Sequence, residues 1–321
     1  MRRAFALLDL LSDGAEHGGT ELAEALGVTR AAVWHQVAQL REQGMAIAAS
    51  RGHGYHLVGG FEALSADGIR AQLSGPARDA LHIETVTITD STNERLLAAL
   101  NSGDIHGQVL LAEHQTAGRG RRGDRWLSPP GSGLCLSLGW RFDQPPATFS
   151  ALSLVVGMAI TESLRELGVS AAMLKWPNDI LYDGGKLAGI LIEMRSEAGG
   201  PCRTVIGIGI NVQMSAQARA LIDQPVEDFT HASGQAVSRN RLAAVLLSAL
   251  ARTLPQFGRD GFAVFRQDWL RYDALVGQAV KLELPNRTVL GVARGVDDHG
   301  ALIIEHDGGR ETFVSGHLAR A

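Results

Sequence analysis

Cysteine and aromatic residues are scarce in this 321-residue sequence. Only two cysteines occur, Cys135 and Cys202, and phenylalanine, tryptophan and tyrosine together make up 5% of the chain. Two cysteines cannot supply a disulfide framework, and their spacing is not that of a metal site, which favours a reducing compartment. The formal net charge is only −4. Any nucleic-acid binding must therefore come from a local patch rather than from the charge of the whole chain.

Long hydrophobic runs are absent as well, since no segment approaches the roughly 20 apolar residues of a membrane span. The first residues, MRRAFALLDLLSDG, resemble a signal peptide in their paired arginines. However, Asp9 interrupts the apolar run, and no small-residue cleavage site follows. We therefore expect a cytoplasmic protein with no membrane contact. The length and the hydrophobic fraction of 45% allow about two domains with buried cores.

Residues 18–44 have the pattern of two helices joined by a tight turn. Thr20 and Thr29 can cap the two helices, and Gly27 can end the first one in a left-handed conformation. Such a pair is typical of a helix-turn-helix. The buried face of the second helix would carry apolar residues at positions i, i+4 and i+7: Val33, Val37 and Leu40.

The exposed side of that second helix and the following hairpin are the predicted DNA-binding surface. Residues 46–58 alternate on both sides of Arg51-Gly52-His53-Gly54, as the wing of a winged helix would, and Arg51 and His53 at its tip could meet phosphates. The alternative is a small helical domain that serves only assembly, but the order of elements favours DNA binding. Candidate DNA contacts on the helix and its first turn are Thr29, Arg30, Trp34, His35 and Gln39.

Glycines at positions 59, 60 and 68 interrupt this pattern, so we place a first domain at residues 1–60 and a linker at 61–81. Residues 82–272 contain more strands than helices, and several strands are joined by hairpins. This favours an α+β domain with a mixed sheet over a doubly wound parallel one. In the helix that follows the first of these strands, Ser91 or Thr92 is available as the cap. Residues 273–321 show short alternating strands with glycine-rich turns, typical of a small β-barrel.

The segment GRGRRGDRW, residues 118–126, contains the G-x-G-x-x-G pattern of a dinucleotide-binding turn. That interpretation requires a helix to begin within the glycines. Here Ser128-Pro129-Pro130-Gly131 follows within a few residues, and no helix can start there. The dinucleotide interpretation therefore fails.

The three arginines of this segment instead predict a loop that closes on an anion. Arg119, Arg121 and Arg122 repel one another unless a phosphate or carboxylate accepts their hydrogen bonds. Closure would also exclude water from a reactive intermediate. Two alternatives are a solvated basic loop and a single-stranded nucleic-acid site in which Trp126 stacks on a base.

The run LKWPND is the second candidate for chemistry. Pro177 favours an extended Trp176, which places Lys175 at the end of a strand. A lysine there can neutralise a carboxylate and a phosphate at once, and Asn178 and Asp179 could hold backbone or coordinate Mg²⁺. The alternative is a solvated Lys175, a core Trp176 and a purely structural turn. Taken alone, the run does not decide between the two.

Five segments occur in an order and spacing that resemble the biotin–protein ligases: DSTNERLL, EHQTAGRGRRGDRW, LKWPNDI, GKLAGILIE and IGIGIN. With the winged helix before them, the chain looks like the bifunctional type of this family, a biotin operon repressor that is also a biotin–[acetyl-CoA-carboxylase] ligase. The resemblance runs through nearly all of the chain. It implies a class II synthetase-like central domain, residues 82–272, and an SH3-like C-terminal domain, residues 273–321.

The resemblance implies a two-step reaction with biotin and ATP as substrates and Mg²⁺ as the accompanying ion. The carboxylate of biotin attacks the α-phosphate of MgATP, which gives biotinyl-5′-AMP and pyrophosphate. The amine of one lysine on the biotin carboxyl carrier protein then attacks this mixed anhydride. The enzyme must supply position and positive charge rather than its own nucleophile. Operator DNA, repression of biotin synthesis genes and a homodimer formed on binding biotinyl-5′-AMP are implied by the same resemblance.

Site residues follow from the resemblance position by position. Lys175, Arg119 and Arg121 would be catalytic, and no metal ligand is assigned to the chain. Two residues depart from the pattern of the family. Asp124 stands where its members usually have a basic residue, and Cys135 stands where they often have an aromatic one. The expected biotin contacts are Ser91, Thr92, Asn93, Gln115, Arg119, Gly120, Arg121 and Lys175. The expected nucleotide contacts are Gly118, Arg119, Arg121, Arg122, Trp126, Lys175, Asn178 and Asn211.

Two other functions are compatible with parts of this pattern. A transcription factor that only senses its ligand would bind biotin without transferring it. A lipoate or octanoate transferase shares the related catalytic fold, but such enzymes lack the arginine–glycine loop.

Overall fold

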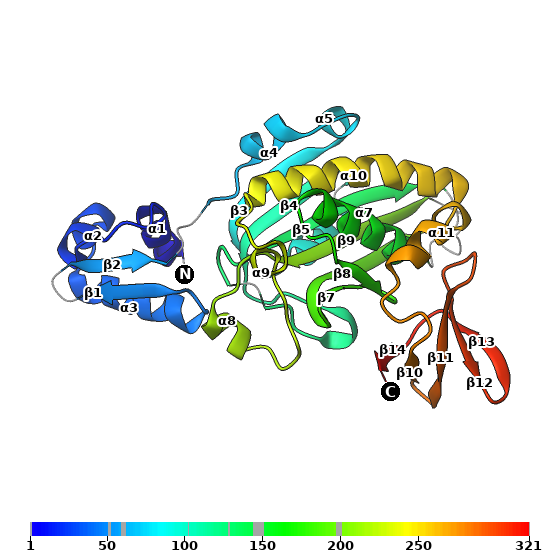
Figure 1. Ribbon diagram of the computed structural model, residues 1–321. Helices are drawn as coiled ribbons and strands as arrows, with labels where there is room; N and C mark the ends of the chain where they lie inside the picture. The colour runs from blue at the N-terminus through cyan, green and yellow to red at the C-terminus, as the bar shows by residue number, and fades with distance from the viewer. Residues whose placement is uncertain are drawn as a thin grey trace.

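The computed structural model describes residues 2–50, 53–58, 62–101, 103–127, 129–143, 151–196 and 201–320. Three units follow one another along the chain: a small N-terminal unit, a large central sheet covered by helices, and a C-terminal sheet (Figure 1). Arg51, expected at the tip of the wing, lies outside the described residues. None of the helices in the described ranges has the length and apolar character that crossing a membrane requires.

The N-terminal unit is the expected winged helix. Gly27 ends the second helix with φ 61°, and the Thr29 hydroxyl caps the third by accepting from the amide of Ala32 at 3.2 Å. Thr20 does not cap the second helix, because the chain enters that helix earlier and Gly18 is the cap position. The elements are α1 (Arg2–Leu10), α2 (Gly19–Leu26), α3 (Arg30–Glu42) and the antiparallel hairpin of β1 (Ile47–Ser50) and β2 (Gly54–Leu57).

This unit contacts the central domain through a residue that follows α3. Gly44, just after α3, accepts a hydrogen bond from the Ser215 hydroxyl at 2.5 Å and lies against Ala218. Both residues belong to a short helical segment, α8 (Ala216–Ala220) with its cap Ser215. The apolar face of α3 is buried as predicted, since Val33, Val37 and Leu40 form the core of the unit.

The central domain is built on a seven-stranded sheet of order β3-β4-β5-β9-β8-β7-β6. Within the described ranges, β3 and β4 are the one parallel pair of strands in this sheet, so the sheet is mixed, as expected. Hairpins join β7 to β8 and β8 to β9. The strands are β3 (His82–Thr89), β4 (Gln108–Gln115), β5 (Gly133–Phe142), β6 (Met173–Lys175), β7 (Asp179–Tyr182), β8 (Gly185–Ser196) and β9 (Cys202–Asn211).

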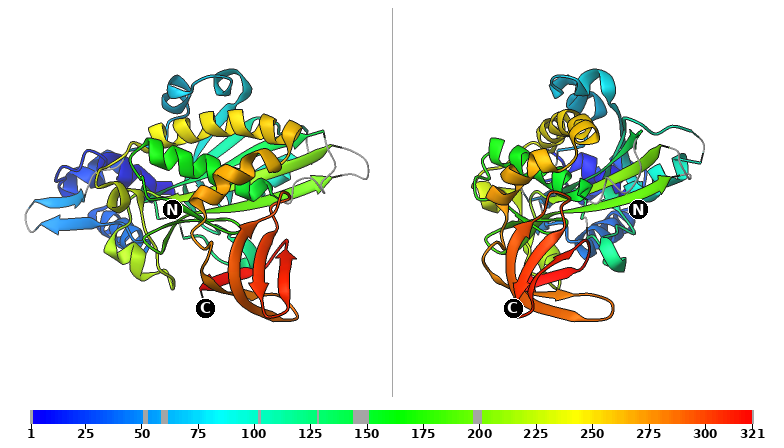
Figure 2. Two further views of the ribbon diagram at one scale, coloured as in Figure 1. Left: turned by 45° about the vertical axis from the view of Figure 1, so that its right-hand side comes forward. Right: turned by 90° about the vertical axis from the view of Figure 1, so that its right-hand side faces the viewer.

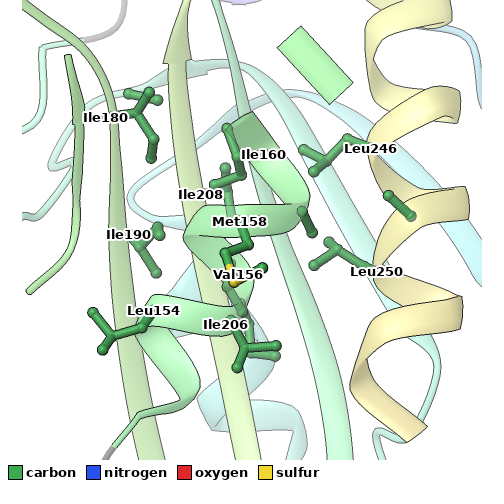
Figure 3. Packing of buried hydrophobic residues seen from close by; sticks show 14 of the residues in the cluster. Leu154, Val156, Met158, Ile160, Ile180, Ile190, Ile206, Ile208, Leu246 and Leu250 are labelled. Atoms are coloured by element: carbon green, nitrogen blue, oxygen red, sulfur yellow. The ribbon is translucent and has the colours of Figure 1, made fainter. Parts of the chain in front are cut away.

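Helices cover both faces of this sheet because its strands bury side chains on both. On one face, α7 (Leu152–Glu166) and α10 (Arg239–Asp260) pack over residues such as Ile206 and Ile208 (Figure 3). On the other face α6 (Thr92–Ala99) packs over Val205, the neighbour of Ile206 in β9. The alternation within β9 follows from the two-residue repeat of a strand. Further helices are α9 (Phe229–Ser233) and α11 (Ala263–Tyr272).

The sequence suggested residues 61–81 as a linker, but residues 62–81 are packed against the central domain. They contain two helices, α4 (Ala66–Gln72) and α5 (Ala77–Ala80). Ile69, Leu73 and Ala77 are fully buried in the main core, and the amide of Ser74 donates to the Ser248 hydroxyl of α10 at 3.0 Å. Glycine content alone did not reveal this, because the helix against which the segment packs, α10, lies far along the chain.

The C-terminal unit is a five-stranded antiparallel sheet of order β13-β12-β11-β10-β14. Figure 2 shows it after α11, below the central domain. It contacts the strand that carries Lys175, because the amide of Ala274 donates to the Leu174 carbonyl at 2.8 Å and the Trp176 indole donates to the Gly300 carbonyl at 3.1 Å. The strands are β10 (Ala279–Glu283), β11 (Thr288–Val296), β12 (Leu302–His306), β13 (Gly309–Phe313) and β14 (His317–Arg320).

Candidate active site

One cavity gathers most of the residues that the sequence singled out. It encloses about 1070 Å³, part of it open to solvent. Its wall comes from the start of α6, the end of β4, the arginine–glycine loop, the β6–β8 region and the start of β14. Segments more than 200 residues apart in sequence therefore meet at one site. The predicted residues in its wall are Ser91, Thr92, Asn93, Gln115, Arg119, Gly120, Arg121, Arg122, Trp126, Lys175 and Asn178.

The floor of the cavity is a buried network of neutral polar groups. The Gln115 side-chain oxygen accepts from the Thr92 amide at 2.8 Å and from the Thr92 hydroxyl at 3.1 Å. The Ser137 hydroxyl lies 2.7 Å from the Thr92 hydroxyl and 2.5 Å from Asn93 Oδ1. Ser137 is fully buried on β5 and was missed, because a single serine in an apolar strand carries no signal. The network fixes the side chains of the floor before any ligand arrives.

Neither Ser91 nor Thr92 caps α6 with its side chain, contrary to the sequence prediction. Ser91 occupies the cap position without a capping bond, and its amide donates to Asp90 Oδ1 at 2.7 Å. Hydrogen bonding to Ser91 and Thr89 holds the pKa of Asp90 below its usual value. The Thr92 hydroxyl is used in the floor instead. Ser91 is buried in the cavity wall.

The arginine–glycine loop folds back on itself above the floor. Gly120 donates to the Asp124 carbonyl at 2.7 Å, and Trp126 donates to the Gly118 carbonyl at 2.9 Å. A side chain at Gly118 would lie 2.5 Å from the Trp126 carbonyl oxygen, so only glycine fits there. Arg122 adopts a left-handed conformation with φ 57°. The loop thus has a defined hairpin-like shape, which its glycines permit.

Two arginines of the loop bind the wall of the cavity. Arg121 Nη1 donates to Asn178 Oδ1 at 2.9 Å, and burial is the main cause that lowers the pKa of Arg121. Arg119 Nη2 lies 2.9 Å from Glu193 Oε1 and 2.8 Å from Glu94 Oε1. The expected repulsion among the arginines is therefore relieved in part by carboxylates of the protein itself. Neither glutamate was predicted as part of the site.

Two lysines face the cavity, Lys175 from the end of β6 and Lys186 from β8, the two strands on either side of β7. Burial lowers the pKa of Lys175, the nearby Asp179 opposes this effect, and the positive charge of Lys186 adds to it. Lys186 Nζ forms an ion pair with Asp179 Oδ1 at 2.8 Å and lies 5.9 Å from the centre of the Trp126 ring. Lys186 was overlooked, although it stands in the motif GKLAGILIE. Together the two ammonium groups make this end of the cavity cationic.

The glycines of β8 and β9 make room for the indole of Trp126. A Cβ atom at Gly209 would lie 2.3 Å from Trp126 Cε2, and one at Gly189 would lie 3.2 Å from Cζ3. The Trp126 ring therefore occupies the space beside both glycines. A strand position without a side chain allows such close approach.

Asn211 does not line the main cavity. Its side-chain amide donates to the backbone carbonyls of Lys186 and Glu227, each at 3.1 Å. It lines a neighbouring cleft, whose wall also includes Gln115, Trp126, residues 221–224 and Val226. Cys135 is buried within β5, and its neighbour Leu136 lines the cavity instead.

The C-terminal sheet completes the cavity with Gly316, His317 and Leu318 from the start of β14. The sequence offered no signal for these residues, because nothing local indicates that β14 faces the central domain.

On the winged helix, all of the candidate DNA-contacting side chains that the structure describes are exposed, and Trp34 is 57% exposed. These are Thr29, Arg30, Trp34, His35, Gln39 and His53.

Comparisons with known proteins now identify the family. Residues 3–56 match a helix-turn-helix domain, residues 85–211 match the biotin/lipoate A/B protein ligase family, and residues 275–317 match the biotin protein ligase C-terminal domain. The bifunctional ligase/repressor BirA of Salmonella typhimurium is 38% identical over 314 residues, which cover 98% of this chain and 96% of that relative. The chain belongs to the biotin–protein ligase family.

Other relatives support the same family assignment. The biotin–[acetyl-CoA-carboxylase] ligase of Mycobacterium tuberculosis is 39% identical over 77% of this chain and 91% of that protein. A biotin protein ligase from Aquifex aeolicus, solved in complex with biotin and ATP, matches with a TM-score of 0.64 and 26% identity. That match covers 75% of this chain and 99% of the other. The family resemblance and the three-part fold expected from the sequence are confirmed.

Proposed function

We propose that this ligase activates biotin with MgATP to biotinyl-5′-AMP and transfers biotin to one lysine of the biotin carboxyl carrier protein of acetyl-CoA carboxylase. One observation carries the proposal. The cavity joins a buried floor of neutral hydrogen-bonding groups to a cationic end that holds Arg121, Lys175 and Lys186. A urea-like ring suits the floor, and a carboxylate next to a phosphate suits the cationic end.

In the first step, the biotin carboxylate attacks the α-phosphorus, a new O–P bond forms, and the bond to pyrophosphate breaks. Two anions must approach each other, so the main task of the protein is to offset their repulsion and hold them in line. Lys175 suits this role because it is half-buried, where a charge interacts more strongly than in water. We assign Lys175, Arg121 and Lys186 to the carboxylate and phosphate groups.

In the second step, the lysine amine of the carrier protein attacks the acyl carbon of biotinyl-5′-AMP. A C–N bond forms, the C–O bond to AMP breaks, and the amine loses a proton. Water would compete with the amine for the same carbon, so the loop of residues 118–126 must cover the intermediate. Ser91, Thr92, Asn93 and Gln115 hold the biotin ring, Arg119 and Gly120 belong to the covering loop, and Trp126 borders the nucleotide.

Mg²⁺ enters this reaction with ATP as part of the substrate. Among the described residues, no three histidine, cysteine, aspartate or glutamate side chains gather closely enough to hold a metal ion. Asp179, a carboxylate in the cavity wall, is paired with Lys186, and the amide of Asn178 donates to the Ile190 carbonyl at 3.1 Å. The phosphates of ATP are therefore the principal ligands that we assign to the ion.

The test is isotope exchange between pyrophosphate and ATP, followed by weighing a carrier-protein fragment after incubation with biotin and MgATP. Exchange should require biotin, and the fragment should gain the mass of one biotinyl group. A ligand-sensing transcription factor would bind biotin, yet transfer it no better than its Lys175→Ala variant. A lipoate or octanoate transferase would prefer lipoate over biotin in direct competition.

The winged helix adds a second activity, because Trp34 and its neighbours project from a recognition helix that the unit leaves exposed. The ligase would bind operator DNA and repress biotin synthesis genes, with biotinyl-5′-AMP as corepressor. Two winged helices presented by a homodimer suit a two-fold operator, and the adenylate would favour that dimer. Sedimentation with and without the adenylate tests this point, since an unchanged monomer fraction contradicts it. A chain that acts on both carrier protein and operator DNA works in the cytoplasm.

A further inference from the structure

Arg119 is bound to the protein itself rather than directed into an open space. Its Nη2 atom lies 2.9 Å and 3.0 Å from the two carboxylate oxygens of Glu193 and 2.8 Å from Glu94 Oε1. Glu193 stands on β8 and Glu94 in the first turn of α6. One guanidinium thus joins the loop to two elements of the cavity wall. Its charge is more than balanced by the two carboxylates.

Glu193 also contacts the floor of the cavity. The Asn93 amide nitrogen donates to Glu193 Oε2 at 2.9 Å and to the Leu191 carbonyl at 3.1 Å. On its other side, Asn93 Oδ1 lies 2.5 Å from the Ser137 hydroxyl. The carboxylate of Glu193 therefore links the loop, through Arg119, to the buried side chains that form the floor.

A surface ion pair would stabilise the loop very little. Glu193 is the least exposed member of this cluster at 26%, whereas Arg119 is 38% and Glu94 48% exposed, so the attachment depends on how the charges converge rather than on burial. Two carboxylates converge on one guanidinium, and charge-assisted hydrogen bonds are about twice as strong as neutral ones. A second attachment, from Arg121 to Asn178, holds the other part of the loop. With both attachments made, the loop forms one wall of the cavity.

We propose that Glu193, assisted by Glu94, is a positioning residue that holds the arginine–glycine loop closed and so retains the activated intermediate until the carrier lysine arrives. This inference rests on the proposed function, since it requires an adenylate to retain. Arg119 then acts mainly as the attachment of the loop, while Arg121 and Lys175 carry the charge that meets the ligand. Opening the loop requires Glu193 and Glu94 to release Arg119.

The experiment measures how fast labelled biotinyl-5′-AMP, formed on the full-length ligase, escapes during a chase with unlabelled biotin. Glu193→Gln keeps an oxygen for Asn93, removes the negative charge and replaces the oxygen that faces Arg119 with an amide donor. The matched control is Glu84→Gln, because Glu84 pairs with Arg95 of α6 at 2.7 Å outside the cavity. We expect escape to become about fivefold to tenfold faster in Glu193→Gln, less so in Glu94→Gln, and not at all in Glu84→Gln.

A double-mutant cycle with Arg119→Gln separates a closing contact from general weakening of the fold. Adding Glu193→Gln to Arg119→Gln should produce no further increase in escape, because the contact is already lost. Thermal unfolding of each variant checks that the fold is kept. Escape at the wild-type rate in Glu193→Gln, or additive effects in the cycle, would overturn the inference. If the wild type forms no adenylate at all, the proposed function fails instead.

Discussion

The substitution Gly207→Ala tests whether the floor of the cavity is as tightly built as the structure indicates. A Cβ atom at position 207 would lie 2.2 Å from Asn93 Oδ1 and 2.8 Å from its Cγ. Asn93 is buried, so its side chain can move away only by giving up hydrogen bonds. Those bonds join it to Ser137, to the Leu191 carbonyl and to Glu193.

The expected cost follows from these three bonds. Two are between neutral groups, at about 1 kcal/mol each, and the one to Glu193 is charge-assisted, at roughly 1.5–3 kcal/mol. Since local movement will preserve some of them, we expect the free energy of unfolding to fall by about 2–4 kcal/mol. Biotin affinity should fall at least about tenfold, because Asn93 forms part of the proposed ring site.

Urea unfolding followed by tryptophan fluorescence and calorimetric titration with biotin measure the two effects. Gly103→Ala is the matched control, because a Cβ atom there meets nothing within 4 Å. A Gly207→Ala variant whose unfolding free energy and biotin affinity both match those of Gly103→Ala would refute the reasoning, since Asn93 would then be free to move.

Three further predictions concern other parts of the chain. Lys175→Met should lower biotin-dependent pyrophosphate exchange by about 10²–10³-fold without destabilising the fold, and exchange at the wild-type rate would contradict its role. Burial raises the pKa of Asp273 from 3.8 to about 6. The fold favours the neutral, protonated carboxyl group, so the contribution of this group to the free energy of unfolding is complete below pH 4 and is lost as the pH rises through 6. Asp273→Asn should therefore be more stable than the wild type at pH 8, by about 2–3 kcal/mol, and equal to it below pH 4; an advantage that does not change with pH would refute this. Trp34→Ala should weaken binding to the promoter DNA of biotin synthesis genes about tenfold while adenylate formation continues, and unchanged DNA binding would exclude Trp34 from the interface.

Features that depend on neighbouring residues were predicted well. The left-handed Gly27, the Thr29 cap and the buried stripe of α3 are set within a few residues of chain, so a short stretch of sequence suffices to recognise them. The mixed sheet was also predictable, because hairpins and strands outnumber helices between residues 82 and 272. In contrast, the cap of α2 was misplaced, since both Gly18 and Thr20 are acceptable there by local rules.

Partners that are distant in sequence were not predicted. Arg119 was expected to bind a ligand, yet its guanidinium forms ion pairs with Glu94 of α6 and Glu193 of β8. The space beside Gly189 and Gly209 holds Trp126, and His317 enters the cavity from the last strand. Each of these contacts exists only because the sheet brings separate segments together.

The sequence by itself determined the kind of molecule: a winged helix, a mixed-sheet ligase domain with its arginine–glycine loop, and a small β-rich C-terminal unit. Periodicity, caps and turns are short-range properties, and motifs keep their spacing along the chain. Only the tertiary structure decided which charges neutralise one another, that residues 62–81 pack on α10, and that β14 closes the cavity. Such choices depend on distances through space, which a linear order of residues does not specify.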